Sequence, residues 1–256
     1  GRQDRRLTAF RNDIMKIRNA VLAVVLAAVP FGALADTMDE DRVKELVLEA
    51  IRENPQIVME AVEILQRRDA EAQAEQQAET LTNQRLLLEQ DPNAPVLGNP
   101  DGDVTVIEFF DYNCPYCRQA MSEVQGLLDA DPNVRLVYRE WPILGDGSVF
   151  AARAALASRN QGKYEEFHWA LMGMDGRAEE ASVMRIANQV GLDIDQLLDD
   201  MESAEIDAHL AESTRLSQAL GFNGTPSFVV GDELLPGFVE EALLLEVVQK
   251  TRDEGQ

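Results

Sequence analysis

Two cysteines separated by two residues are the part of this sequence best suited to chemistry. Cys114 and Cys117 are its only cysteines, and Pro115 and Tyr116 lie between them. At the first turn of a helix this spacing brings two sulfurs close enough to form and break a disulfide, and the amide dipoles stabilise a thiolate on the first. We therefore predict that Cys114 is an exposed nucleophile of low pKa and that Cys117 is the resolving thiol.

Other uses of a C-x-x-C motif require ligands that the sequence does not place nearby. Haem attachment needs a histidine directly after the second cysteine, where Arg118 stands. A four-ligand zinc site would have to recruit both distant histidines, His168 and His209, which we interpret as packing or surface residues. Redox chemistry is favoured because an apolar strand precedes the motif, a helix follows it, and Thr225-Pro226 precedes a later strand.

The elements predicted around the motif follow the order of a thioredoxin fold. An almost unbroken run of β-formers at residues 104–110 indicates a strand that is covered on both faces. The elements expected after it are a helix at 117–130, a strand at 134–138, a helical insert at about 148–220 with breaks near Gly162, Gly176 and Gly191, strands at 227–230 and 233–235, and a helix at about 239–251. We expect an α/β protein in which residues 91–256 form a thioredoxin fold with a helical insertion, preceded by an α-helical N-terminal extension.

That extension has the pattern of amphipathic helices. Between Asp39 and Leu65 apolar residues recur at helical spacing, with an interruption at Asn54-Pro55. Residues 66–80 are strong helix formers without a large apolar side chain, which predicts a solvated helical connector. Because the amphipathic pair cannot bury its own apolar stripe, we expect residues 36–90 to be an arm that associates with other copies of the chain. The alternative is that the pair folds back on its own catalytic domain.

The first 35 residues have the features of a secretory signal. A basic stretch precedes an apolar run from Ala20 to Val29, and Ala33-Leu34-Ala35 matches an A-x-A cleavage site. The run is shorter than the ~20 residues that span a bilayer, so we predict cleavage near Ala35 and not a retained anchor. Met15 also resembles a natural start, which would make residues 1–14 an upstream artefact.

The charge of the chain argues against a nucleic-acid partner. Its 23 basic and 46 acidic side chains give a formal charge of −23 over 256 residues. Removing the six basic and two acidic residues of the signal leaves 17 and 44, a charge of −27. Such a surface repels nucleic acid and anionic lipid surfaces, so we do not expect a nucleic-acid partner.

The residues around the motif resemble a known family. Residues 106–117 (VIEFFDYNCPYC) and 224–228 (GTPSF) are similar to the DsbA-like branch of the thioredoxin superfamily. Within that branch, the N-terminal helical arm resembles the suppressor-of-copper-sensitivity C proteins. The resemblance covers roughly residues 100–251 for the catalytic domain and 39–88 for the arm.

This resemblance implies roles for residues beyond the cysteines. Thr225 and Pro226 would form a cis-proline pair that faces the site and binds extended substrate through the backbone of Thr225. Glu108 matches the buried acid beneath the disulfide in DsbA-like proteins and would relay the proton of Cys117, whereas the alternative is a solvated strand glutamate. No organic cofactor is implied, and the arm of such relatives suggests three chains.

The dipeptide between the cysteines departs from that of the strongest oxidases. It is Pro-Tyr and not Pro-His, which removes one stabiliser of the thiolate. Threonine before the cis-proline is found in isomerase-like relatives, and an oligomer would face several active sites into a shared cleft. We therefore predict isomerase or reductase activity more than strong oxidation.

The sequence leads to one main hypothesis and two alternatives. The first is a periplasmic thiol–disulfide oxidoreductase acting on unfolded or misoxidised exported proteins, with a membrane redox partner. Its expected substrate-binding residues are Pro115, Tyr116, Thr225 and Phe222. The two aromatic residues would offer apolar surface to a client, and the alternative is that they belong to the core. The alternatives are a copper-tolerance protein that holds Cu(I) between the two thiolates and an envelope protein with an inert disulfide.

Overall fold

The computed structural model describes residues 39–255, so the predicted signal at 1–35 lies outside the described residues. The chain divides into a unit that ends at Val62 and a larger unit that begins at Glu63. The first holds helix α2 (Glu40–Glu53) and the beginning of helix α3 (Gln56–Gln90), which are separated at Asn54-Pro55 as predicted. Within residues 39–255, no helix combines the length and the apolar character that a membrane crossing requires.

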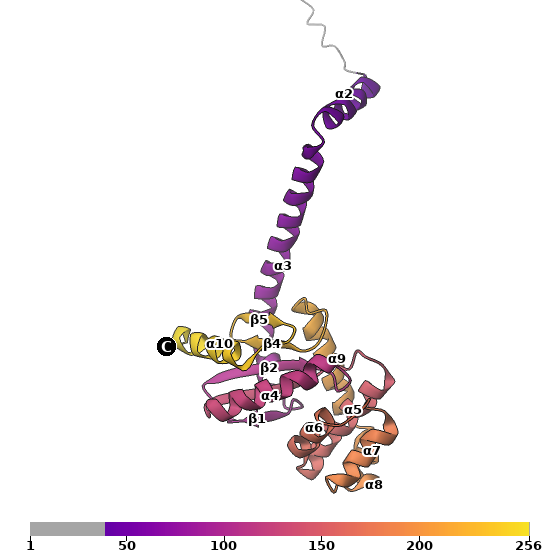
Figure 1. Ribbon diagram of the computed structural model, residues 1–256, viewed down its shortest axis with the longest axis vertical. Helices are drawn as coiled ribbons and strands as arrows, with labels where there is room; N and C mark the ends of the chain where they lie inside the picture. Colours follow the sequence, from indigo (N-terminus) through magenta and orange to yellow (C-terminus); the bar gives the residue numbers. More distant parts are fainter. Residues whose placement is uncertain (1–38, 256) are drawn as a thin grey trace, which may run out of the picture. The chain divides into compact units, whose positions relative to one another are not determined.

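The larger unit is built on a five-stranded mixed sheet in the order β1-β3-β2-β4-β5 (Figure 1). The strands are β1 (Val96–Gly98), β2 (Val104–Phe110), β3 (Val134–Glu140), β4 (Ser227–Val230) and β5 (Glu233–Pro236). Strands β2 and β3 run parallel, and the other pairs are antiparallel. Helix α4 (Pro115–Ala130) connects β2 to β3, which gives the predicted strand–helix–strand unit at the centre of the sheet.

A helical insert separates β3 from β4, as expected. It consists of α5 (Asp146–Ala157), a short 3-10 helix (Ser158–Gln161), α6 (Tyr164–Met172), α7 (Glu180–Gln189), α8 (Ile194–Asp200) and α9 (Ala204–Ala219). Helices α5 to α8 gather at one end of the sheet, and α10 (Glu241–Glu254) completes the chain (Figure 1). The predicted breaks coincide with Gly162, Gly176 and Gly191, which all have positive φ angles that favour glycine. The thioredoxin fold with a helical insertion is thereby confirmed.

Strand β1 is an element that the sequence pattern did not predict. It lies in a segment rich in proline and glycine and pairs with β3 through only three residues. It ends at Gly98, whose φ is 69° and where a Cβ atom would lie 2.7 Å from the carbonyl oxygen of Val134. Glycine therefore allows the edge strand to approach β3 closely.

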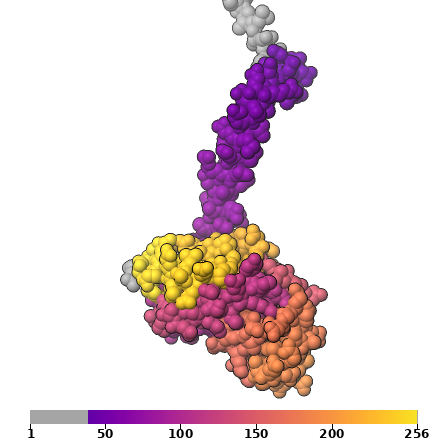
Figure 2. All heavy atoms as spheres, viewed as in Figure 1, coloured from indigo at the N-terminus to yellow at the C-terminus, as the bar shows by residue number. Residues whose placement is uncertain are grey.

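Both faces of the sheet are covered, as the apolar run of β2 predicts. Val106 and Phe110 lie in the cluster formed with α4, α10 and the insert, whereas Ile107 and Phe109 lie in a second cluster on the opposite face. Helix α10, yellow in Figure 2, lies against the magenta segment that contains α4. The acid at position 108 therefore lies on the face that carries the cysteine helix.

The C-terminal part of α3 packs against the second face of the sheet. Leu81 and Leu88 are buried in the second cluster, and Gln77 donates a hydrogen bond to the carbonyl oxygen of Leu220 at 2.9 Å. Thr80 also contacts the end of α9 through the carbonyl oxygen of Ala219. Residues 66–76 are exposed, as expected of a solvated connector. The prediction is wrong at residues 77 and 80, whose polar side chains bind backbone carbonyl oxygens at the end of α9.

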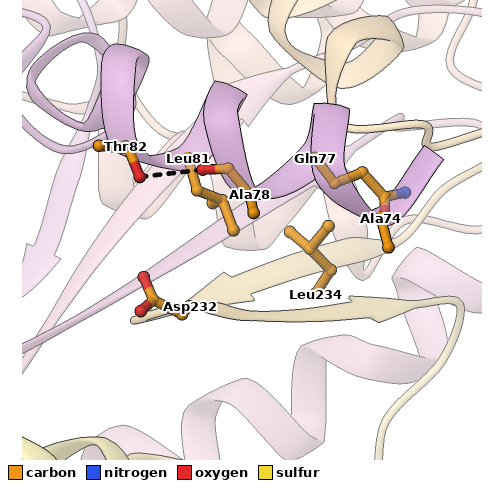
Figure 3. A pocket seen from close by; sticks show the side chains of 7 residues that line it. All are labelled: Ala74, Gln77, Ala78, Leu81, Thr82, Asp232 and Leu234. Carbon is orange, nitrogen blue, oxygen red and sulfur yellow. Dashed lines mark hydrogen bonds between the residues drawn. The ribbon is translucent and has the colours of Figure 1, made fainter. Parts of the chain in front are cut away.

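A pocket of about 300 Å³ lies between this part of α3 and the β4–β5 hairpin (Figure 3). Its lining residues are Ala74, Gln77, Ala78, Leu81, Thr82, Asp232 and Leu234. Because α3 covers the face opposite to α4, this pocket lies away from the cysteines.

Candidate active site

The cysteine motif forms the start of α4. Cys114 is the N-cap residue and Pro115 occupies the first helical turn, as the sequence predicts. The amide of Cys114 donates to the carbonyl oxygen of Asp111 at 3.0 Å, which closes a turn just before the helix. Both cysteines are free thiols, and Tyr116 between them is 62% exposed. The motif thus places one thiol at the helix end and the other one turn further in.

The two thiols have opposite pKa shifts. A hydrogen bond from Cys117 lowers the pKa of Cys114 to about 6, and burial opposes this shift. A hydrogen bond with the side chain of Thr225 and two backbone amides of the turn add to the lowering. Burial, followed by the hydrogen bond with Cys114, raises the pKa of Cys117 far above its usual range. These directions agree with a nucleophilic first thiol and a protonated resolving thiol, although the roles themselves stay predictions.

The expected exposure of Cys114 is wrong. The residue is only 5% exposed, because the loop before β4 lies over its sulfur. Its Sγ donates to the carbonyl oxygen of Thr225 at 3.1 Å. The Thr225–Pro226 peptide bond is cis, as the family resemblance implies, and the carbonyl oxygen of Pro226 accepts from the amide of Gly237. The structure therefore brings Thr225 and Pro226 to the cysteines.

Phe222, expected at the substrate surface, lies elsewhere. It is 6% exposed and belongs to the cluster on the opposite face of the sheet. Its ring packs edge-on against Phe109 with 5.6 Å between centroids. The expected contact between Phe222 and a client is therefore wrong, and the alternative of a core residue is confirmed. Pro115 and Tyr116 are exposed beside the first thiol.

Glu108 is buried on the cysteine face of the sheet. It is 3% exposed, which excludes the alternative of a solvated strand glutamate. Burial and then the charge of Cys114 raise its pKa to about 8. In return, the charge of Glu108 is among the causes that raise the pKa of Cys117. A carboxyl group with this pKa can exchange protons with a thiol near neutral pH.

Asp111 supports the motif, a role that sequence reasoning missed. Its Oδ1 accepts from the amide of Asn113 at 2.7 Å, and its Oδ2 accepts from the amides of Ile143 and Leu144 at 2.8 and 2.9 Å. Asp111 therefore ties the turn before Cys114 to the loop after β3. An aspartate just before a helix is a known turn former, which was the available signal.

Asn113 and Arg118 connect the motif to the helical insert. Asn113 donates to Ser148 at 3.1 Å and to the carbonyl oxygen of Ala178 at 3.0 Å, and it accepts from the amide of Ala178 at 2.7 Å. Arg118 donates to the carbonyl oxygen of Tyr112 and to two carbonyl oxygens of the α6–α7 loop. The insert therefore holds both ends of the motif.

Both histidines are buried and pack within the fold. Burial lowers the pKa of His168 to about 3. Burial would also lower the pKa of His209, but hydrogen bonds with Asp91 and Glu140 outweigh it and raise the value. Among residues 39–255, no group of three or more potential metal-ligating side chains comes together.

Comparison with known proteins identifies both parts of the chain. Residues 105–249 match the model of the DSBA-like thioredoxin domain, and residues 39–72 match the Copper resistance protein ScsC N-terminal domain.

Solved structures that are similar to the chain include three from different bacteria. A thioredoxin-like oxidoreductase from Silicibacter pomeroyi DSS-3 is 71% identical, with 66% of this chain and 98% of that chain covered at a TM-score of 0.66. A linker-deletion mutant of Proteus mirabilis ScsC is 25% identical, with coverages of 87% and 99% and a TM-score of 0.64. BcfH of Salmonella enterica Typhimurium is 29% identical, with coverages of 83% and 95% and a TM-score of 0.65.

Curated relatives match over part of their length. A Na(+)/H(+) antiporter NhaA 1 of Salinispora arenicola (strain CNS-205) is 32% identical over 148 residues, which are 57% of this chain and 23% of that protein. The chain thus spans about a quarter of the antiporter. Because the thioredoxin-domain model matches more than half of the chain, and the cysteines, the cis-proline and the buried acid lie together, the chain belongs to the DSBA-like thioredoxin domain family.

Proposed function

We propose that the chain is a periplasmic thiol–disulfide oxidoreductase that isomerises or reduces disulfides of exported proteins more readily than it introduces them. The observation that carries this proposal is the pair of thiols with opposite pKa shifts under the carbonyl oxygen of Thr225. At neutral pH the Cys114 thiolate can attack a disulfide, and the protonated Cys117 can afterwards release the client from the mixed disulfide.

The reaction follows from this arrangement. The Cys114 thiolate attacks a client disulfide, forming a mixed disulfide and expelling a client thiolate that takes a proton from water. In isomerisation, a client thiolate then attacks the mixed disulfide and restores Cys114. In reduction, Glu108 first releases its own proton to water and then accepts the proton of Cys117, which attacks the Cys114 sulfur. The second client sulfur leaves as a thiolate and takes a proton from water, so the products are a Cys114–Cys117 disulfide and a reduced client.

The pKa of Cys114 supports a moderate redox potential. A value of about 6 lies nearer to the ~7 of thioredoxin than to the ~3.5 of a strong oxidase. Tyr116 occupies the position where the strongest oxidases have a histidine, and its ring is exposed. A less stable thiolate makes the disulfide a weaker oxidant, which favours isomerase or reductase work.

The arm supports association between copies of the chain. The exposed apolar residues of the first unit are Val43, Leu46, Val47, Leu48, Ile57, Val58, Met59 and Val62. Burying them between copies would remove a large apolar surface from water and bring several active sites together. We propose a homo-oligomer, with three chains as the number that the family resemblance suggests, and a membrane redox partner for the thioredoxin domain.

A related Salmonella protein is described as periplasmic, which supports the proposed location.

The reduction potential of the Cys114–Cys117 pair tests this proposal. It should be measured in glutathione buffers on the chain from Asp36 onward, together with refolding of a protein with scrambled disulfides. A potential towards ~−200 mV or lower with active refolding is expected, whereas ~−120 mV would identify a strong oxidase. The Cys114→Ser variant should be inactive, and the matched Cys117→Ser variant should accumulate mixed disulfides.

Binding of Cu(I) by the two thiolates is a second candidate. The match of residues 39–72 to a copper-resistance domain favours it, and thiolates are ligands that select Cu(I). The 1% exposure of Cys117 argues against easy access for a metal. Competition with a Cu(I) chelator tests this second candidate, which could coexist with disulfide exchange. Both single cysteine variants should lose tight Cu(I) binding if the two thiolates share the ion.

A further inference from the structure

Buried ionisable side chains form a connected path that the thiol chemistry does not use. It begins at Arg139 on β3, which is fully buried. Its Nη1 donates to Oδ2 of Asp91 at 2.5 Å, and its Nη2 donates to the carbonyl oxygen of Leu87. Because Leu87 lies in the last turn of α3 and Asp91 follows that helix, Arg139 binds the end of α3.

His209 on α9 is the next member of the path and contacts groups on both sides of the end of β3. Its Nδ1 lies 3.3 Å from Oδ2 of Asp91, and its Nε2 lies 2.8 Å from Oε2 of Glu140. Successive side chains of a strand point to opposite faces, so Arg139 and Glu140 lie on different sides of the sheet. His209 therefore joins the α3 side to the cysteine side.

The path continues to the segment before the first thiol. The hydroxyl of Tyr164 donates to Oε1 of Glu140 at 2.6 Å, and the Tyr164 ring stacks on His168 with 5.6 Å between centroids. Nδ1 of His168 lies 3.0 Å from the hydroxyl of Tyr112. Tyr112 is two residues before Cys114 in the sequence, and its carbonyl oxygen accepts from Arg118 at 3.1 Å. The path thus ends at the backbone that carries the nucleophile.

Each member of this path depends on its neighbours. A buried charge that loses its partner is strongly unfavourable, so the groups keep one another in place. A shift of the last turn of α3 would remove an acceptor from Arg139 and disturb the groups around His209. A displacement of the last turn of α3 should therefore change the position of the backbone at Tyr112.

We propose that His209 is a positioning residue of the thiol site, because it connects the end of α3 to Tyr112 and thereby holds the backbone that carries Cys114. The inference rests on the proposed function only in taking Cys114 as the reacting thiol. The contact of Arg139 with the end of α3 then has a function, because the end of this helix helps to set the reactivity of Cys114.

A His209→Gln variant of the chain from Asp36 onward tests this role through the ionisation of Cys114. Absorbance of the thiolate near 240 nm and the pH dependence of alkylation should show that the pKa of Cys114 is higher by at least half a unit than in the wild type. Below the midpoint, alkylation should therefore be about threefold slower. Leu216→Ala is the matched control, because Leu216 is fully buried on the same helix but lies outside the path. It should lower stability and leave the ionisation of Cys114 unchanged.

A reciprocal measurement needs no variant. If protonation of His209 changes the free energy of oxidising the two thiols, oxidation of the thiols must change the free energy of protonating His209 by the same amount. The groups facing its ring are Asp91 after α3, Arg139 and Glu140 on β3, and Ser213 on α9. The NMR titration of the ring should therefore differ between the dithiol and disulfide forms.

The two measurements separate this inference from the proposed function. Cys114 ionisation that is unchanged in the His209→Gln variant, or an identical His209 titration in both redox forms, would overturn the positioning role while disulfide exchange remains intact. An inactive wild-type chain would overturn the proposed function, and the titration of His209 would still decide the inference.

Discussion

Two buried glutamates on neighbouring strands have different surroundings. Glu108 on β2 and Glu140 on β3 are 3% and 1% exposed. Glu140 accepts hydrogen bonds at 2.6 Å from Tyr164 and interacts with His209 at 2.8 Å. At Glu108, burial and the charge of Cys114 both disfavour the carboxylate and raise its pKa to about 8.

The difference shows that burial alone does not determine what an acid does. A carboxylate with close partners fixes the structure around it, since removing either side leaves an uncompensated group. An acid whose neighbours favour the neutral form holds a proton that it can exchange near neutral pH. Glu140 therefore holds the structure around it, including the path from His209 to Tyr112, whereas Glu108 is suited to exchange protons with the thiols.

The largest expected effect comes from Glu140→Gln. The change removes the charge opposite His209 and weakens the bond from Tyr164, so the free energy of unfolding should fall by about 3 kcal/mol. Urea denaturation at pH 7 measures it. Lys250→Gln is the control, because Lys250 forms an exposed ion pair with Glu233 and its loss should change stability by no more than ~0.5 kcal/mol. Equal stability of Glu140→Gln and wild type would remove the distinction between the two acids.

Glu108→Gln is expected to raise the free energy of unfolding, in contrast to Glu140→Gln. A folded-state pKa raised from 4.5 to about 8 means that stability from the neutral acid is complete below pH 4.5 and is lost as the pH rises through 8. The variant cannot ionise, so at pH 8 it should be more stable than wild type by on the order of 1–3 kcal/mol. At pH 4 this advantage should disappear. Denaturation at the two pH values checks the sign, and a variant that is less stable at pH 8 would contradict it.

Oxidation of the thiols should have a smaller effect on Glu108. A Cys114–Cys117 disulfide removes the thiolate charge, the second of the two causes that raise the pKa of the acid, and leaves burial in place. The pKa should fall below about 8 but stay above 4.5. Infrared titration of the carboxyl band compares the two redox forms, with Glu108→Gln to assign the band. An identical titration in both forms would mean that the acid does not sense the thiols.

The sequence was sufficient for the fold and for the central chemistry. The unbroken β-formers of β2 and the glycine breaks of the insert have local causes, so local patterns predicted them. The three-residue strand β1 depends on pairing with β3, which no local pattern reports.

The residues that support the site lie beyond the reach of such patterns. Asp111 binds an amide 32 residues away, Asn113 binds a carbonyl 65 residues away, and His209 meets Glu140 across 69 residues. Phe222 was misplaced for a related reason: it is close to the cis-proline in sequence, but its ring enters the opposite face of the sheet. Only the folded chain brings these partners together.

The smallest effect on stability should come from Tyr116→Ser, which touches neither glutamate. Tyr116 is 62% exposed, so the free energy of unfolding should change by no more than ~0.5 kcal/mol. Its position beside Cys114 should instead matter to large clients, whose disulfides must pass its ring. We expect refolding of a scrambled protein to slow about threefold, roughly the loss of a weak apolar contact, while exchange with glutathione stays unchanged. Leu243→Ser is the matched control, because Leu243 is an exposed apolar residue of α10 and should affect neither reaction. If both variants slow the refolding equally, Tyr116 contributes only general surface hydrophobicity, and client recognition has to be sought around the cis-proline.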